Sequence, residues 1–182
     1  MPRWLNLANF FTLLRLVLVP FIISGIVNGH HIQALVLFFA AALTDVADGA
    51  LARSHGGSTR TGAYFDPIAD KCLMSGVFLA LWAADIVPGW FVAIIFARDI
   101  YILLGVLAAL ALTKVRTFPP TLWGKLSTLV QVVTAICWMV RNAWPAPVFD
   151  AVSAAMLWVC VAFTLASGLD YTWRGVHLFR AH

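Results

Sequence analysis

Four aspartates lie close together in the chain, at the edges of two long apolar stretches: Asp45, Asp48, Asp66 and Asp70. The chain has eight acidic residues, all of them Asp, so half of its negative charge falls within this one stretch. An Asp at the centre of a membrane helix costs about 2.5–3.5 kcal/mol on insertion scales. A bound cation would offset that cost, because buried carboxylates are stabilised by pairing or by metal coordination.

The spacing of these acids fits helices. Asp45 and Asp48 are three residues apart and Asp66 and Asp70 are four apart, and both spacings place the two residues on one helical face. An oxygen-only donor set without His or Cys favours Mg²⁺ or Mn²⁺, and we expect two ions for the four carboxylates. Such ions clamp the attacking and leaving oxygens in phosphate displacement. Solvated loop charges are the alternative, but they would not lie inside apolar runs.

Residues around the acids also suit a phosphate ligand. Gly49 follows Asp48 directly and lets a ligand approach the backbone. Arg53 supplies a planar fork for phosphate or a base edge. The turn Gly56-Gly57-Ser58-Thr59 precedes a predicted helix whose N-terminal amides favour an anion.

The composition indicates an integral membrane protein. Of the 182 residues, 62% are hydrophobic and 11% are charged, whereas soluble chains have roughly 45–50% apolar and 25% charged residues. The length fits a single membrane domain, residues 1–182. The net charge of +4 is modest. It fits basic residues that set the orientation in the membrane and contact anionic lipids, and it does not indicate a nucleic-acid partner.

Hydropathy predicts an all-α protein with six transmembrane helices, since a span needs about 20 apolar residues. A short amphipathic segment with Trp4, Leu5 and Phe10 precedes them. The predicted spans are Phe11–Asn28, Ile32–Arg53, Gly62–Ile86, Pro88–Leu112, Thr121–Val140 and Val148–His177. Lys and Arg are concentrated at both termini and in the second and fourth loops, which predicts that both termini and all four acids lie on the cytosolic side.

The order D-x2-D-G-x2-A-R-x8-G-x3-D-x3-D, read from Asp45 to Asp70 without a gap, resembles the signature of the CDP-alcohol phosphatidyltransferases. The N-terminal pattern Asn9-Phe-Phe-Thr12-Leu-Leu-Arg15 is also similar to that family. The resemblance implies six transmembrane helices in the cytoplasmic membrane, an active site facing the cytosol, and a homodimer.

The resemblance also implies roles for the motif residues. Metal ions would be held by Asp45, Asp48 and Asp66, with Asp70 completing the site and acting as the base that deprotonates the acceptor hydroxyl. The donor, CDP-diacylglycerol, would release CMP. Its cytidine diphosphate would be contacted by Gly49, Arg53 and Thr59.

Two basic residues outside the motif have two interpretations each. Arg98, in the middle of a predicted span, is either a clamp for the acceptor's phosphate or an ion-pair partner of an aspartate in the second or third helix. Lys125 either binds the acceptor's phosphate or anchors its helix at the cytosolic surface. No role is assigned to Arg15, Asp99 or Asp170.

The acceptor is predicted to be glycerol 3-phosphate. The residues from Ser58 to Lys71, and the pattern Gly124-Lys125-x2-Thr128-x2-Gln131, resemble phosphatidylglycerophosphate synthases. Asp99 after Arg98, with no basic residue before Lys114, is more similar to cardiolipin synthases, whose acceptor is phosphatidylglycerol. A non-enzymatic cation carrier is a remote alternative. Carriers place their site near the bilayer midplane and often contain repeats, whereas the four acids are predicted to lie at the cytosolic side.

Overall fold

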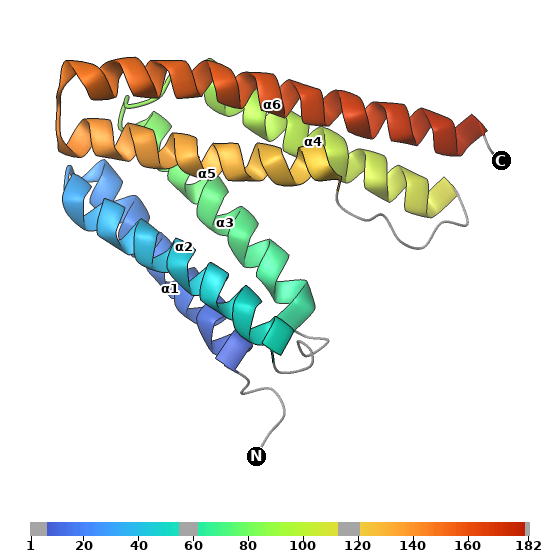
Figure 1. Cartoon of the computed structure of the whole chain (residues 1–182), viewed down its shortest axis with the longest axis horizontal. Coiled ribbons are helices and arrows are strands. Elements are labelled where there is room, and N and C mark those ends of the chain that lie inside the picture. Colours follow the sequence, from blue (N-terminus) through green and yellow to red (C-terminus); the bar gives the residue numbers. More distant parts are fainter. Residues whose placement is uncertain (1–6, 55–61, 113–120, 181–182) are drawn as a thin grey trace. The chain divides into compact units, whose positions relative to one another are not determined.

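The computed structural model describes residues 7–54, 62–112 and 121–180, and these residues form six α-helices and no strands (Figure 1). The prediction of an all-α chain is therefore confirmed for the described residues. The helices are α1 Leu7–Val27, α2 His31–Ser54, α3 Gly62–Ala83, α4 Gly89–Leu112, α5 Leu122–Ala143 and α6 Pro147–Arg180.

Most helix ends fall within a few residues of the predicted positions, and two differences have a clear origin. Helix α1 begins at Leu7, so Phe10 belongs to α1 and not to a separate lead-in segment. Helix α3 ends at Ala83 and not at Ile86, because the chain turns there. The Ile86 N–H donates to the Leu81 carbonyl and the Asp85 N–H to the Trp82 carbonyl, both at 2.9 Å, and Asp85 has a φ of 56°. These two bonds form a Schellman motif.

Helices α1, α2 and α3 belong to one compact unit, Met1–Ile86. Within it α1 packs against both α2 and α3. The contact with α2 is close at Gly25, where an added Cβ would lie 3.1 Å from the Cβ of Ala34. Ile22, Phe38 and Val77, one from each helix, are fully buried in the core of this unit.

Helices α4, α5 and α6 belong to a second compact unit, Val87–His182, in which α6 packs against both α4 and α5. Small polar side chains are buried along α5 and α6: Ser127, Gln131, Thr134, Ser153, Thr164 and Ser167. Such residues are common where membrane helices pack, because they allow close approach and hydrogen bonding. That residues 1–182 form a single domain remains a prediction.

Three helical stretches among the described residues are long and apolar enough to cross a membrane: Gly89–Ala108, Leu122–Ala143 and Pro147–Gly175. Shorter apolar stretches lie in α1, Leu13–Val27, and in α2, His31–Thr44. Large apolar side chains are exposed, including Leu43, Leu122 and Leu169 at 70% each. An apolar exterior of this kind fits contact with lipid. Six membrane crossings and cytosolic termini remain predictions.

Candidate active site

The motif aspartates lie on two consecutive helices of the first unit. Asp45 and Asp48 are in α2, Asp66 and Asp70 are in α3, and residues 55–61 connect these helices. All four positions are helical, which is the condition that the spacing argument requires. The structure describes the backbone of Asp45, Asp48 and Asp66 but not their side chains, so their convergence on one site stays a prediction.

The three residues that are predicted to contact the donor substrate, CDP-diacylglycerol, lie in the same part of the chain. Gly49 and Arg53 belong to the last turns of α2, and their side-chain surroundings are not described. Thr59 lies in the segment between α2 and α3, outside the described residues. Their contacts with cytidine diphosphate therefore stay predictions.

Asp70 has a partner that the sequence did not indicate. Its Oδ1 accepts a hydrogen bond from Nη1 of Arg15, and the two side chains form an ion pair between α3 and α1. The Arg15 side chain is only 1% exposed, whereas that of Asp70 is 45% exposed. The proposed base is therefore held by a buried cation on one side while it keeps access to its surroundings.

Arg15 has no predicted role, although the sequence contains a signal for one. Arg15 is a single basic residue in the apolar stretch of α1. A cation at such a position is stabilised by facing a protein partner. The sequence indicates that a partner exists, but only the packing of α1 against α3 identifies it as Asp70.

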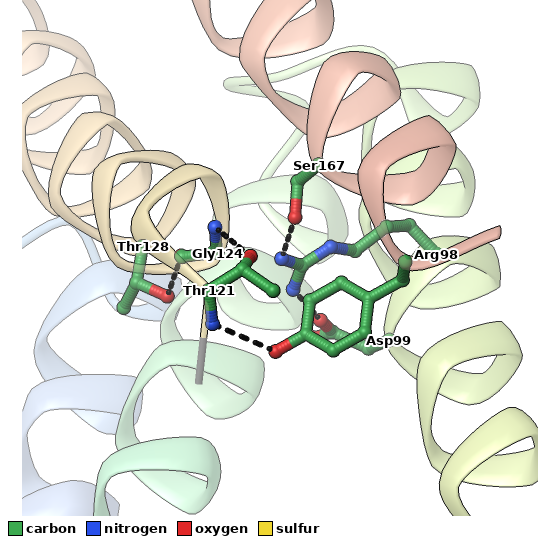
Figure 2. A network of polar contacts seen from close by, with 7 residues as sticks. Arg98, Asp99, Thr121, Gly124, Thr128 and Ser167 are labelled. Atoms are coloured by element: carbon green, nitrogen blue, oxygen red, sulfur yellow. Dashed lines mark hydrogen bonds and ion pairs between the residues drawn. The ribbon is translucent and has the colours of Figure 1, made fainter. Parts of the chain in front are cut away.

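A second polar cluster lies in the other unit, between α4 and α6. Figure 2 shows the Arg98 guanidinium between Asp99 and Ser167. Its Nη1 donates to Asp99 Oδ1 at 2.9 Å, and its Nη2 donates to Ser167 Oγ. The side chains of Arg98 and Asp99 are 11% and 17% exposed. The carboxylate that Arg98 is seen to pair with is therefore on its own helix. Pairing with an aspartate of α2 or α3 has no support among the described side chains.

The N-terminus of α5 appears in the same view (Figure 2). Thr121 is its N-cap, and its Oγ1 accepts a hydrogen bond from the Gly124 N–H at 3.0 Å. The Thr121 N–H donates to the Tyr171 hydroxyl of α6 at 3.5 Å. This capping explains why α5 begins at Leu122, one residue later than predicted. Lys125 lies in the first turns of α5 and is exposed, and within the described residues its ammonium group makes no ion pair.

Asp99 and Asp170, for which the sequence predicts no role, also have partners. Asp99 pairs with Arg98, as described above. Asp170 in α6 pairs with Arg174 one turn later, at 3.4 Å between Nε and Oδ2. Both carboxylates are therefore explained locally as counter-charges to neighbouring arginines.

The side chains of the motif that could bind a metal fit a hard divalent cation. They are carboxylates alone, on two helices joined by a short segment, with neither His nor Cys at the specified positions of the motif. Over the described residues no group of three or more His, Cys, Asp or Glu side chains converges. Of the four motif acids, only Asp70 has a side chain that the structure describes, so this observation does not test the proposed metal site. The family is generally dependent on a divalent metal, and the identity and number of the ions remain a proposal.

Comparisons with known proteins agree with the motif. The sequence model of the family described as CDP-alcohol phosphatidyltransferase matches residues 5–166. The chain is 36% identical to a probable phosphatidylglycerophosphate synthase of Mycobacterium tuberculosis, over 96% of this chain and 83% of that protein. It is 30% identical to the CDP-diacylglycerol–glycerol-3-phosphate 3-phosphatidyltransferase of Bacillus subtilis, over 91% of this chain and 93% of that protein.

A third relative has a different name. The chain is 30% identical to the CMP-forming cardiolipin synthase of Rattus norvegicus, over 89% of this chain and 58% of that protein. The family match covers most of the chain and includes the whole motif from Asp45 to Asp70. This chain of apolar helices belongs to the CDP-alcohol phosphatidyltransferase family.

Proposed function

We propose that the protein transfers the phosphatidyl group from CDP-diacylglycerol to glycerol 3-phosphate and releases CMP. The observation that carries this proposal is the ungapped eight-residue motif on α2 and α3, within a family match over residues 5–166. Relatives named for this reaction match over most of their length: the chain covers 93% of the Bacillus subtilis enzyme. The assignment of substrates to this chain rests on those names.

The reaction exchanges one P–O bond for another. A hydroxyl oxygen of the acceptor attacks the phosphorus that carries diacylglycerol, the bond from that phosphorus to CMP breaks, and CMP leaves with the electron pair. The hydroxyl proton passes to the carboxylate of Asp70. General base assistance of this kind contributes roughly 10²–10⁴ in rate. The 45% exposure of the Asp70 side chain is compatible with access of an acceptor to it.

The metal site would be formed by Asp45, Asp48, Asp66 and Asp70, which we propose to hold two Mg²⁺ or Mn²⁺ ions. Ions bound there would neutralise charge on the pyrophosphate and on the departing CMP. Gly49, Arg53 and Thr59 would orient cytidine diphosphate beside these carboxylates.

The acceptor's phosphate would be bound by Arg98 and Lys125. Both lie in the second unit, and both are basic residues in helices that are otherwise mostly apolar. Arg98 already has Asp99 as a counter-charge at 2.9 Å, so it would bind a phosphate with only part of its hydrogen-bonding capacity. Lys125, exposed in the first turns of α5, makes no ion pair among the described residues, and the N-terminus of α5 beside it favours a bound anion.

The topology proposed with this function places both termini and the active site on the cytosolic side of the cytoplasmic membrane. The distribution of Lys and Arg along the sequence supports this orientation. Membrane lipids would then surround the helices and supply the donor from within the bilayer. A homodimer is proposed on the family resemblance alone.

Phosphatidylglycerol is a second candidate for the acceptor, which would make the protein a cardiolipin synthase. Two observations favour it: Asp99 follows Arg98, and a relative named as a CMP-forming cardiolipin synthase is 30% identical. The partial neutralisation of Arg98 by Asp99 fits an acceptor with a phosphodiester, which carries less charge than the phosphate monoester of glycerol 3-phosphate.

The decisive experiment supplies purified protein in detergent with CDP-diacylglycerol and each acceptor separately. CMP release with phosphatidylglycerophosphate as the lipid product supports the main proposal. Cardiolipin formation from phosphatidylglycerol alone would establish the second candidate. No CMP release with either acceptor, in the presence of Mg²⁺ or Mn²⁺, would refute both and leave the cation-carrier alternative.

A further inference from the structure

The ion pair between Arg15 and Asp70 joins two side chains with very different exposure, 1% and 45%. A buried guanidinium is strongly destabilising unless a carboxylate compensates it. The Asp70 carboxylate therefore contributes to stabilising the buried charge of Arg15. The charge of Asp70 needs Arg15 less, because the surroundings of a half-exposed carboxylate can also stabilise it. What Arg15 can provide to Asp70 is a fixed direction for one of its oxygens.

The backbone that carries Arg15 is held against α3. An added Cβ at Gly76 of α3 would lie 2.9 Å from Cδ1 of Ile23 and 3.4 Å from Cγ1 of Val19, both in α1. Val19 follows Arg15 by one helical turn and Gly76 lies further along α3 than Asp70, so the two helices run parallel and stay in contact beyond the ion pair. This packing fixes the position from which the guanidinium reaches Asp70.

We propose that Arg15 is a positioning residue for phosphatidyl transfer, which orients the Asp70 carboxylate toward the acceptor hydroxyl. The inference rests on the proposed function, in which Asp70 is the base. A guanidinium is suited to this role, because its planar array of N–H donors restrains a carboxylate more than an ammonium group does. The nucleophilic hydroxyl and its base must be within hydrogen-bond reach in the transition state.

The role predicts a specific kinetic signature. Six other residues are proposed to hold the metal ions and cytidine diphosphate alongside Asp70, so loss of Arg15 should affect turnover much more than donor affinity. Misplacement of a reacting group by about 1 Å lowers rates by up to roughly 10²-fold. We therefore expect Arg15→Met to lower kcat by about 10-fold to 10²-fold, while the affinity for CDP, measured by calorimetric titration with Mg²⁺, stays close to that of the wild type.

Two further variants make the test specific. Arg15→Lys keeps the positive charge but lacks the planar array of donors, so its kcat should lie between those of the wild type and Arg15→Met. Arg141→Met is the matched control: Arg141 pairs with Asp150 in the other unit, and the two side chains are 37% and 56% exposed. This control removes an interhelical ion pair of the same type, and its kcat should be unchanged. All rates are taken per folded molecule, with the folded fraction measured by size-exclusion chromatography and thermal melting.

The outcomes separate the inference from the function on which it rests. If wild-type protein releases no CMP with either acceptor, the proposed function fails. If the wild type is active and folded Arg15→Met keeps wild-type kcat, the positioning role is overturned. It is also overturned if CDP affinity falls as far as kcat, since Arg15 would then act on donor binding or on the fold. Should Arg15→Met not fold, Arg15→Lys decides: lowered kcat with unchanged CDP affinity supports the proposal, and wild-type kcat rejects it.

Discussion

Replacing Asp70 by Asn should affect both catalysis and stability, for reasons that can be separated. Asn has nearly the same size but cannot accept the hydroxyl proton as a base. We expect turnover to fall by about 10²–10⁴. The same substitution removes the carboxylate that pairs with Arg15, whose side chain is 1% exposed, so the folded state should also be destabilised.

The size of the stability effect follows from the two exposures. Breaking a fully buried ion pair by removing one partner costs about 3–5 kcal/mol. Asn keeps a carbonyl oxygen that can accept from Arg15, and the side chain at position 70 is 45% exposed, so the cost should lie below that range, at about 1–3 kcal/mol. For a chain of this length that corresponds to a decrease in Tm of roughly 2–12 °C.

The assay combines thermal melting in detergent with CMP release per folded molecule. The double variant Arg15→Met/Asp70→Asn also removes the buried guanidinium that has lost the Asp70 carboxylate, so it should be more stable than Asp70→Asn alone, while remaining equally inactive. If Asp70→Asn turns over at the wild-type rate per folded molecule, Asp70 is not the base. If its CDP affinity falls as far as that of Asp45→Asn, Asp70 is chiefly a metal ligand. A double variant no more stable than the single one would refute the buried-charge argument.

Three other predictions concern the metal, the acceptor and the packing. A chelator should abolish CMP release and Mg²⁺ or Mn²⁺ should restore it, and Asp45→Asn should weaken CDP binding in calorimetry; full activity in chelator would contradict the metal assignment. Arg98→Met should raise the KM for glycerol 3-phosphate at least about 10-fold, because a hydrogen bond from a charged group is lost. The KM for CDP-diacylglycerol should change little. An unchanged KM for glycerol 3-phosphate would leave Arg98 a purely structural role. Gly25→Ala should destabilise the fold by about 1–3 kcal/mol, because its Cβ would lie 3.1 Å from Ala34 Cβ. The control is Gly105→Ala, where no atom lies within 4 Å and helix propensity predicts a gain of about 0.5–1 kcal/mol; equal melting temperatures would reject this reasoning.

The positions of the helices and the chemistry of the motif could be predicted from the amino-acid sequence alone. Long apolar stretches interrupted by Gly, Pro and charged residues predicted six helices close to those observed in the described residues. The ends that differ depend on local hydrogen bonds, such as the Schellman motif at Asp85 and the N-cap at Thr121. The acids from Asp45 to Asp70 identified the family because their residue types and spacing suffice for that.

The pairing of polar side chains that are distant in the chain depends on how the helices pack and could not be predicted from the sequence. Arg15 and Asp70 are 55 residues apart in the chain, and Arg98 and Ser167 are 69 apart. A lone arginine in an apolar stretch is expected to face protein, because a charge that faces lipid is costly. The sequence does not show which helix packs against that arginine. Arg98 is an example: the sequence allows a clamp for the acceptor's phosphate or an ion pair with an aspartate of the second or third helix, and among the described side chains the structure pairs it with the adjacent Asp99. The long arginine side chain reaches partners in several directions, and the surrounding helices determine which direction is available.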